Sequence, residues 1–177
     1  QAVVDQLEVW QNDDVACRLW RRDPTIWADA DTPEITNRLG WLDLPETMQE
    51  TAQDIQAFAD AVAGEVDTVV VLGMGGSSLT PDLLGRVFGS MDGYPDLQVL
   101  DSTHPEAVRK AAERLDLQRT LFVVASKSGT TTETLSFFHF FWDRVQKVSD
   151  DPGRHFVAVT DPGTPLAELG AERDFRD

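Results

Sequence analysis

Cysteine and long apolar runs are scarce in this sequence of 177 residues. Cys17 is the only cysteine, so the chain can form neither an internal disulfide nor a cysteine metal site, and we expect a reducing, cytoplasmic location. We interpret Cys17 as a small apolar residue on a helix. No apolar run approaches the roughly 18–20 residues that a membrane span needs, and the N-terminus lacks a signal-peptide pattern. We therefore expect no membrane association.

Positive charge is scarce as well, because 31 acidic residues face 15 basic ones and the formal net charge is −16. The lysines are Lys110, Lys127 and Lys147. Binding to nucleic acid or to an anionic membrane depends on Lys and Arg that neutralise phosphates, so we expect neither partner. A small anion is still compatible with this charge. Scattered carboxylates are screened beyond about 8 Å, whereas a helix N-terminus offers roughly +0.5 charge at contact.

The first third of the sequence shows only helical patterns. We expect a helix over residues 3–22, a short helix with Thr32 as N-cap and Pro33 in its first turn, and a helix over residues 46–63 that Gly64 closes. No strand pattern precedes residue 67. Residues 1–64 are therefore predicted to form a helical segment that packs on the following domain.

From residue 65 onward, short β-branched runs alternate with helical patterns. The expected strands are residues 68–72, 97–100, 120–125 and 154–160, and the expected helices are residues 78–89, 104–115, 131–148 and 165–169. This alternation predicts an α/β fold, a three-layer αβα sandwich with a parallel sheet of four to five strands. Residues 171–177 resemble the approach to a fifth strand. We therefore expect residues 65–177 to be a domain truncated at its C-terminal end, within a longer polypeptide.

Residues 126–134 are the most informative part of the chain. An apolar strand stops at Ser126, and six hydroxyl residues, Lys127 and Gly129 follow within nine positions before a helix. Such a loop collects N–H and hydroxyl donors at a helix N-terminus, which suits a bound phosphate. Thr130 and Glu133 fit a capping box. The other hydroxyls exceed what a cap needs, and Lys127 opposes the helix dipole unless an anion binds nearby. These extra hydroxyls belong to Ser126, Ser128, Thr131 and Thr132.

A second turn of this kind, residues 73–78, follows the first predicted strand. Its glycines weakly fit a dinucleotide fingerprint, because Ser78 stands where the third glycine belongs, while Asp101 could hold a ribose. The turn is neither a P-loop, since Gly-Lys-Ser/Thr is absent, nor a nucleophile elbow, since Leu79 replaces the second glycine. A phosphate site, a dinucleotide site and a plain tight turn all stay open here.

The three histidines form no cluster. His104 precedes a proline at a helix start, His155 begins a strand, and His139 lies in the aromatic stretch 137–142. That stretch is apolar nearly all round, so we expect a helix buried between layers and interpret His139 as a core or interface histidine. The sequence has no metal-ligand spacing and no paired carboxylates that we can place in one cleft, and we expect neither metal nor cofactor.

Together these motifs resemble the sugar isomerase (SIS) domain family, and within it the glucose-6-phosphate isomerases. Residues 73–81 are similar to the family motif G-I-G-G-S-x-L-G-P, with Met74 for Ile and Thr80 for the later Gly. Residues 126–134 are similar to S-K-T-F-T-T-x-E-T, with Ser128 and Gly129 for Thr-Phe, as in bacterial and generic SIS sequences. Residues 101–104 resemble a further family stretch. Residues 27–44 resemble the isomerase half of bacterial transaldolase/glucose-6-phosphate isomerase fusions. The resemblance covers roughly residues 20–177.

The resemblance implies a sugar-phosphate site and an aldose–ketose isomerisation of glucose 6-phosphate and fructose 6-phosphate. The implied phosphate-binding residues are Gly76, Ser77, Ser126, Lys127, Ser128, Gly129, Thr130 and Thr131. In the family a glutamate base moves a proton from C2 to C1 through a cis-enediol, helped by an arginine, a histidine and a lysine. We find no match for these groups here and assign no catalytic residue. Glu133 matches a family glutamate near the site, but we assign it no catalytic step. We therefore expect an isomerase as the parent protein and a fragment that binds phosphosugars without turnover.

Two other functions remain open. One is a SIS module that senses phosphosugars in a transcription regulator, although the acidic N-terminal helices do not resemble a DNA-binding segment. The other is a dinucleotide-binding oxidoreductase domain. The exposed edge of an incomplete sheet and the aromatic helix at 137–142 would favour association, either as a homodimer or with the missing C-terminal part.

Overall fold

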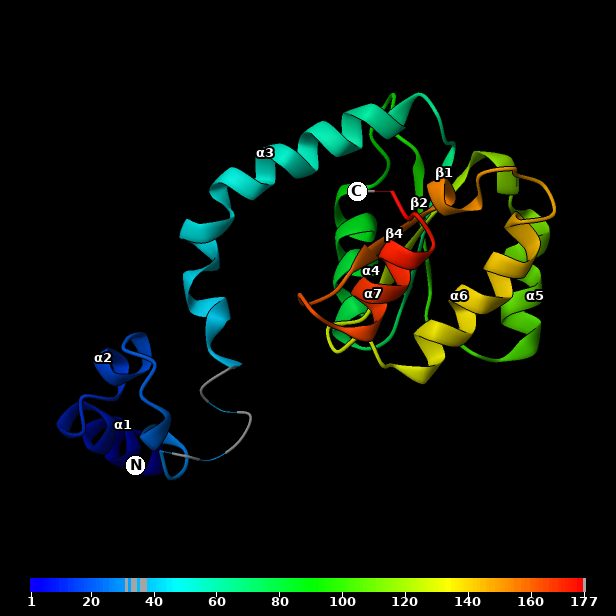
Figure 1. Cartoon of the computed structure of the whole chain (residues 1–177). Helices are drawn as coiled ribbons and strands as arrows, with labels where there is room; N and C mark the ends of the chain where they lie inside the picture. The colour runs from blue at the N-terminus through cyan, green and yellow to red at the C-terminus, as the bar shows by residue number, and fades with distance from the viewer. Residues whose placement is uncertain (31, 33–34, 36–37, 177) are drawn as a thin grey trace. The chain divides into compact units, whose positions relative to one another are not determined.

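A computed structural model describes the chain except for residues 31, 33–34, 36–37 and 177. The chain divides into two compact units, Gln1–Ile55 and Gln56–Asp177 (Figure 1). The second unit contains the whole sheet. The predicted boundary after residue 64, and the packing of the helical segment on the next domain, stay predictions.

The first unit is helical, as the sequence predicts, but its first helix is broken. Helix α1 (Ala2–Asn12) ends before α2 (Val15–Trp20) because Asp14 has a φ of 50°, which an α-helix does not accommodate. The predicted continuous helix over 3–22 is therefore wrong. Cys17 lies on α2 and is exposed.

The rest of this unit leads through short turns into a long helix. A 3₁₀ turn η1 (Pro24–Ile26) follows α2, and η3 (Gly40–Asp43) precedes α3 (Leu44–Ala63). The predicted helix that starts at Thr32 and Pro33 falls largely on positions outside the described residues. Helix α3 starts two residues before its predicted start and ends at Ala63 as predicted.

Strands and helices alternate in the second unit as predicted. The strands are β1 (Thr68–Gly73), β2 (Asp96–Leu100), β3 (Thr120–Ala125) and β4 (Phe156–Val159). The described residues form one parallel sheet in the order β2-β1-β3-β4. Residues 154–155 were expected in the last strand but belong to a 3₁₀ turn η5 (Pro152–His155). Proline and glycine favour this turn over an extended strand start.

Helices cover both faces of the sheet and make three layers (Figure 1). On one face α4 (Gly76–Phe88) and the end of α3 pack on side chains such as Leu97 and Leu121. On the other face lie α5 (Pro105–Arg114), α6 (Thr132–Val145) and α7 (Pro165–Glu172). A 3₁₀ turn η4 (Leu117–Arg119) connects α5 to β3. The predicted αβα sandwich is confirmed.

An aromatic cluster fills the space between the sheet and α6. The ring of Phe122 on β3 stacks on Phe141 with centroids 4.5 Å apart and on Phe156 with centroids 5.2 Å apart. Phe138 meets Phe156 edge-to-face at 5.3 Å. His139 is exposed, so it is not a core histidine, and its interpretation as an interface histidine stays a prediction. Because α6 has the sheet on one side only, every third or fourth residue is buried and the residues between them face outward.

Candidate functional site

The two polar turns leave the same rim of the sheet. Their strands are adjacent and parallel, and Gly73 at the end of β1 is the register partner of Ala125 at the end of β3. The strand order places β1 and β3 on either side of the point where the connections change direction. Ligands of open α/β sheets bind at the carboxyl ends of strands at this point.

The first turn brings the α4 N-terminus close to the end of β1. Gly75 is the N-cap with a φ of 57°, a conformation that favours glycine. A Cβ on Gly73 would lie 3.0 Å from the Ser77 Cβ, so the strand and the helix approach closely. Ser78 is buried, and its hydroxyl donates to the Gly75 carbonyl. The start of α4 therefore lies at the rim, where the Ser77 and Ser78 N–H groups donate to the Met74 and Gly75 carbonyls.

Hydroxyl groups link the second turn to the start of α6. The Oγ of buried Ser126 lies 2.9 Å from the Thr131 Oγ1, and the Ser128 Oγ lies 3.0 Å from the Thr130 Oγ1. The Ser126 carbonyl accepts a bond from the Gly129 N–H. These bonds close a compact loop around the helix N-terminus.

The helix start differs by one residue from the prediction. Thr131, not Thr130, is the N-cap of α6, and its side chain makes no capping bond because its hydroxyl pairs with Ser126. The Thr130 N–H instead bonds to the Ser128 Oγ. The capping box of Thr130 and Glu133 is therefore wrong, and the first-turn N–H groups of α6 have no side-chain cap.

Lys127 has an ionic partner that the sequence analysis did not find. Its Nζ lies 3.5 Å from the Asp161 Oδ2, and both side chains are exposed. Asp161 belongs to a third polar turn, residues 160–164, which follows β4 on the same rim. The signal was present in the sequence, since Thr-Asp-Pro-Gly-Thr after an apolar strand is a polar turn at a strand end.

Gly129 is required by this third turn. It has a φ of +68°, and a Cβ there would lie 2.7 Å from the Thr164 Cβ and 2.8 Å from the Leu166 backbone nitrogen. Only glycine lacks both the conformational and the steric penalty at this position. The turn after β3 is thus packed directly against the start of α7.

The eight residues predicted to bind phosphate all lie on this rim or at its two helix starts. Gly76 and Ser77 begin α4, and the other six form the loop between β3 and α6. Asp101 lies just beyond the end of β2, at the same edge, and is exposed.

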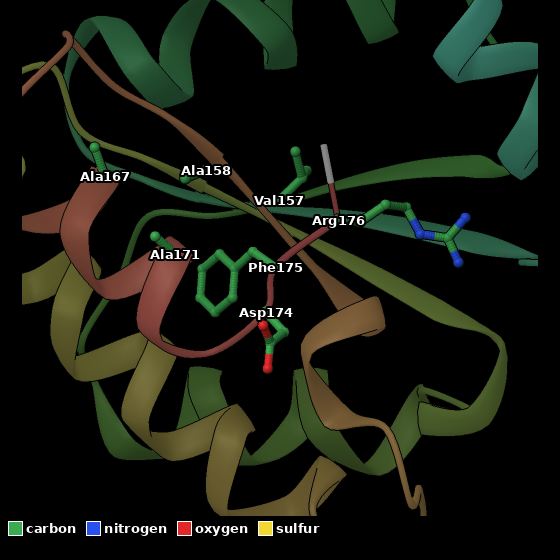
Figure 2. A pocket seen from close by; sticks show the side chains of 8 residues that line it. Val157, Ala158, Ala167, Ala171, Asp174, Phe175 and Arg176 are labelled. Carbon is green, nitrogen blue, oxygen red and sulfur yellow. The ribbon is translucent and has the colours of Figure 1, made fainter.

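Figure 2 shows a second hollow, which is lined by other residues. A cavity of about 380 Å³ lies beside β4, α7 and the C-terminal residues, and its lining includes Val157, Gly170 and Phe175. None of the predicted site residues lines it. The Arg176 N–H donates to the Phe156 carbonyl at this edge of the sheet, where a fifth strand would pair. This cavity is therefore a feature of the open sheet edge.

Two absences concern the part of the chain that the structure describes. It contains no group of three or more His, Cys, Asp or Glu side chains placed to hold a metal ion. None of its helices combines the length and the apolar character needed to cross a membrane.

Comparison with known proteins agrees with this geometry. The sequence profile of the family described as phosphoglucose isomerase matches residues 16–175, which is most of the chain. The chain belongs to the phosphoglucose isomerase family. The matched region contains all three polar turns of the rim.

Individual relatives from several bacteria share this region. A Thermus thermophilus glucose-6-phosphate isomerase is 35% identical over 138 residues, which are 77% of this chain and 32% of the relative. The enzyme of the same name from Acaryochloris marina is 31% identical over 88% of this chain and 29% of its own length. The chain therefore spans about a third of these phosphoglucose isomerases.

Solved structures of relatives have the same fold. A Thermus thermophilus protein described as hypothetical superimposes with a TM-score of 0.76 at 29% identity, over 97% of this chain and 40% of its own. A glucose-6-phosphate isomerase from Chlamydia trachomatis superimposes with a TM-score of 0.64 at 28% identity, over 84% of this chain and 27% of its own.

Proposed function

We propose that this chain is the phosphosugar-binding N-terminal SIS subdomain of a glucose-6-phosphate isomerase. The rim would hold the phosphate of glucose 6-phosphate or fructose 6-phosphate, and the whole protein would interconvert the two sugars in glycolysis and gluconeogenesis. The observation that carries the proposal is the register of Gly73 with Ala125, because it brings two donor-rich helix starts to one rim.

The donors available on this rim suit a phosphate group. The N-termini of α4 and α6 each contribute roughly half a positive charge, and the first-turn N–H groups of α6 have no side-chain cap. The paired hydroxyls of Ser126 and Thr131 can each redirect a hydrogen toward an oxyanion, since a hydroxyl both donates and accepts. The Lys127 ammonium supplies a full charge at the edge of the loop. We assign substrate binding to these groups, together with Gly76, Ser77, Ser128, Gly129 and Thr130.

Phosphate binding alone does not isomerise a sugar. The reaction needs a base that can take the C2 proton, and no residue of this sequence matches the family's glutamate, arginine, histidine or lysine in that role. We propose that the base belongs to the part of the relatives that has no counterpart in this chain. The 177-residue chain would then bind the ester without turnover.

Association and location are further parts of the proposal. Apolar side chains are exposed along α4, which would favour either a homodimer or contact with the rest of a longer enzyme. The exposed cysteine on α2 fits a reducing cytoplasm. The strongly acidic surface again argues against nucleic acid and anionic membranes as partners.

The test is calorimetric titration with 6-phosphogluconate, which keeps the phosphate but has no aldehyde to isomerise. Ser126→Ala combined with Thr131→Ala removes two charge-assisted donors, each worth about 1.5–3 kcal/mol, and should weaken binding at least tenfold per donor. The free energy of unfolding should fall far less, since both members of the hydroxyl pair are removed together. Unchanged affinity in this double variant would remove the loop from the site.

Two controls separate the alternatives. Ser136→Ala removes a hydroxyl that donates to the Thr132 carbonyl within α6 and should leave affinity unchanged. Titration with NAD addresses the dinucleotide hypothesis, which would require NAD binding with no response to the sugar phosphate. Detectable isomerase turnover by the purified chain would contradict the assignment of the base to another segment.

A further inference from the structure

The turn between β4 and α7 is connected to the proposed phosphate loop by side-chain and backbone bonds. The Asp161 N–H donates to the Lys127 carbonyl at 3.2 Å, and the Thr160 hydroxyl donates to the same carbonyl at 3.4 Å. The Ser126 N–H donates to the Val159 carbonyl at 3.0 Å, in continuation of the sheet. The backbone of residues 126–127 is therefore held by β4 and the turn that follows it.

The hydroxyl groups of this turn connect the first turn of α7 to the Lys127 carbonyl. The Ala167 N–H donates to the Thr164 Oγ1, which lies 2.7 Å from the Thr160 Oγ1. Either threonine hydroxyl can be the donor of this short contact, and the Thr160 hydroxyl also lies 3.4 Å from the Lys127 carbonyl oxygen. The first turn of α7 thus fixes the carbonyl next to the proposed phosphate site.

The carboxylate of the same turn acts on the Lys127 side chain. The ammonium and the Asp161 carboxylate form an exposed ion pair at 3.5 Å, and exposed pairs of this kind are weak. A phosphate dianion bound by the loop would compete with Asp161 for the ammonium and would be repelled by its charge. The backbone of the turn therefore supports the loop, whereas its carboxylate opposes the ligand.

We propose that the turn of residues 160–164 positions the phosphate loop through Thr160, while Asp161 is a resident counter-ion of Lys127 that a phosphate ester must displace. This inference rests on the proposed function and adds two positioning residues to that site. The carboxylate lowers affinity for the dianion and holds the ammonium at the rim when no ester is bound. Two neighbouring residues then have opposite effects on the same equilibrium.

Calorimetric titration of the full chain with 6-phosphogluconate at pH 7.5 tests the proposal. Asp161→Asn keeps the backbone bond to Lys127 and should tighten binding about threefold to tenfold, because repulsion and competition by one charge at this range are worth about one factor of ten. Thr160→Val keeps the shape but removes both hydroxyl bonds and should weaken binding at least threefold. Thr160→Ser, which restores the hydroxyl, should recover the affinity.

The control for net charge is Asp143→Asn. This exposed residue lies near the far end of α6, eleven residues from its start and thus about 16 Å along the helix, beyond the screening length of about 8 Å. The affinity of the Asp143→Asn variant for 6-phosphogluconate should equal that of the unmodified chain. If Asp143→Asn raised the affinity as much as Asp161→Asn does, the counter-ion role would be overturned. It would also be overturned if Asp161→Asn bound 6-phosphogluconate no more tightly than the unmodified chain.

The protonation state of the ligand gives a second readout. A phosphate monoester loses its second proton near pH 6, so the gain in affinity from Asp161→Asn should be larger at pH 7.5 than at pH 5.2. A purely structural effect of the substitution would be the same at both pH values and would contradict the proposal. If the unmodified chain does not bind 6-phosphogluconate, the proposed function is wrong. If it binds the ester but the variants at residues 160 and 161 do not change affinity as expected, only this inference is wrong.

Discussion

Gly129→Ala separates two reasons for a glycine in the phosphate loop. The first is conformational, because a φ of +68° costs a residue with a side chain about 1–2 kcal/mol. The second is steric, because the new methyl group would lie 2.7 Å from the Thr164 Cβ and 2.8 Å from the Leu166 backbone nitrogen. Overpacking of this kind costs about 1–3 kcal/mol, so the total loss of unfolding free energy should be about 2–5 kcal/mol.

Two other glycines of the same rim provide matched controls. Gly163 has a φ of +72°, and a Cβ added there would meet no atom within 4 Å, so Gly163→Ala should cost the conformational part only, about 1–2 kcal/mol. Gly76 has neither a positive φ nor a neighbour within 4 Å, and Gly76→Ala at the first position of α4 should be neutral or stabilise by up to about 1 kcal/mol. The loss of unfolding free energy should therefore be largest for Gly129→Ala, smaller for Gly163→Ala and smallest for Gly76→Ala.

The assay is urea unfolding followed by circular dichroism. With a typical slope of about 2 kcal/mol per molar urea, the Gly129→Ala midpoint should fall by about 1–2.5 M. Its affinity for a sugar phosphate should fall as well, because the loop and the start of α7 must separate to admit the methyl group. An equal destabilisation of Gly129→Ala and Gly163→Ala would refute the steric part of the reasoning.

Two further predictions concern the core and the first unit. Phe122→Ala removes a fully buried ring that stacks on two others and should lower the unfolding free energy by about 3–5 kcal/mol in the same urea assay, while truncation of the half-exposed Val159 to alanine should cost under about 0.5 kcal/mol. Hydrogen bonds from Thr25, and then from Arg18, lower the pKa of Asp23 to about 2 from its ordinary 3.8. Since the folded pKa is the lower one, the carboxylate stabilises the fold above pH 3.8, and this contribution should disappear as the pH falls through 2; carboxyl chemical shifts in an NMR titration measure it, and a midpoint near 3.8 would contradict it.

The sheet and the rim could be predicted from the sequence because both depend on local sequence patterns. β-Branched runs mark the strands, and polar turns after the first and third strands mark a shared edge once the sheet is parallel. The register that pairs Gly73 with Ala125 comes from the structure alone, because the first strand was predicted to end at residue 72. Motif order and chain topology therefore carry most of the information about where a phosphate would bind.

The features that the sequence did not reveal depend on tertiary contacts or on a single dihedral angle. The break at Asp14 depends on one positive φ in an otherwise helical pattern. His139 is exposed because it lies on the face of α6 that points away from the sheet, although the residues on either side of it in the sequence are aromatic. The partner of Lys127 lies 34 residues away along the chain, and only the pairing of β3 with β4 brings Asp161 beside it.

Distance explains how a chain with a large negative net charge can bind an anionic ligand. A net charge of −16 spread over the surface acts weakly on a bound anion, because carboxylates beyond about 8 Å are largely screened. Donors in contact with the phosphate are not screened in this way, so two helix starts and a few hydroxyls can outweigh many remote charges. The same reasoning singles out Asp161. Its carboxylate lies 3.5 Å from the ammonium that the ligand needs, so this one negative charge should influence binding more than the scattered excess over the rest of the surface.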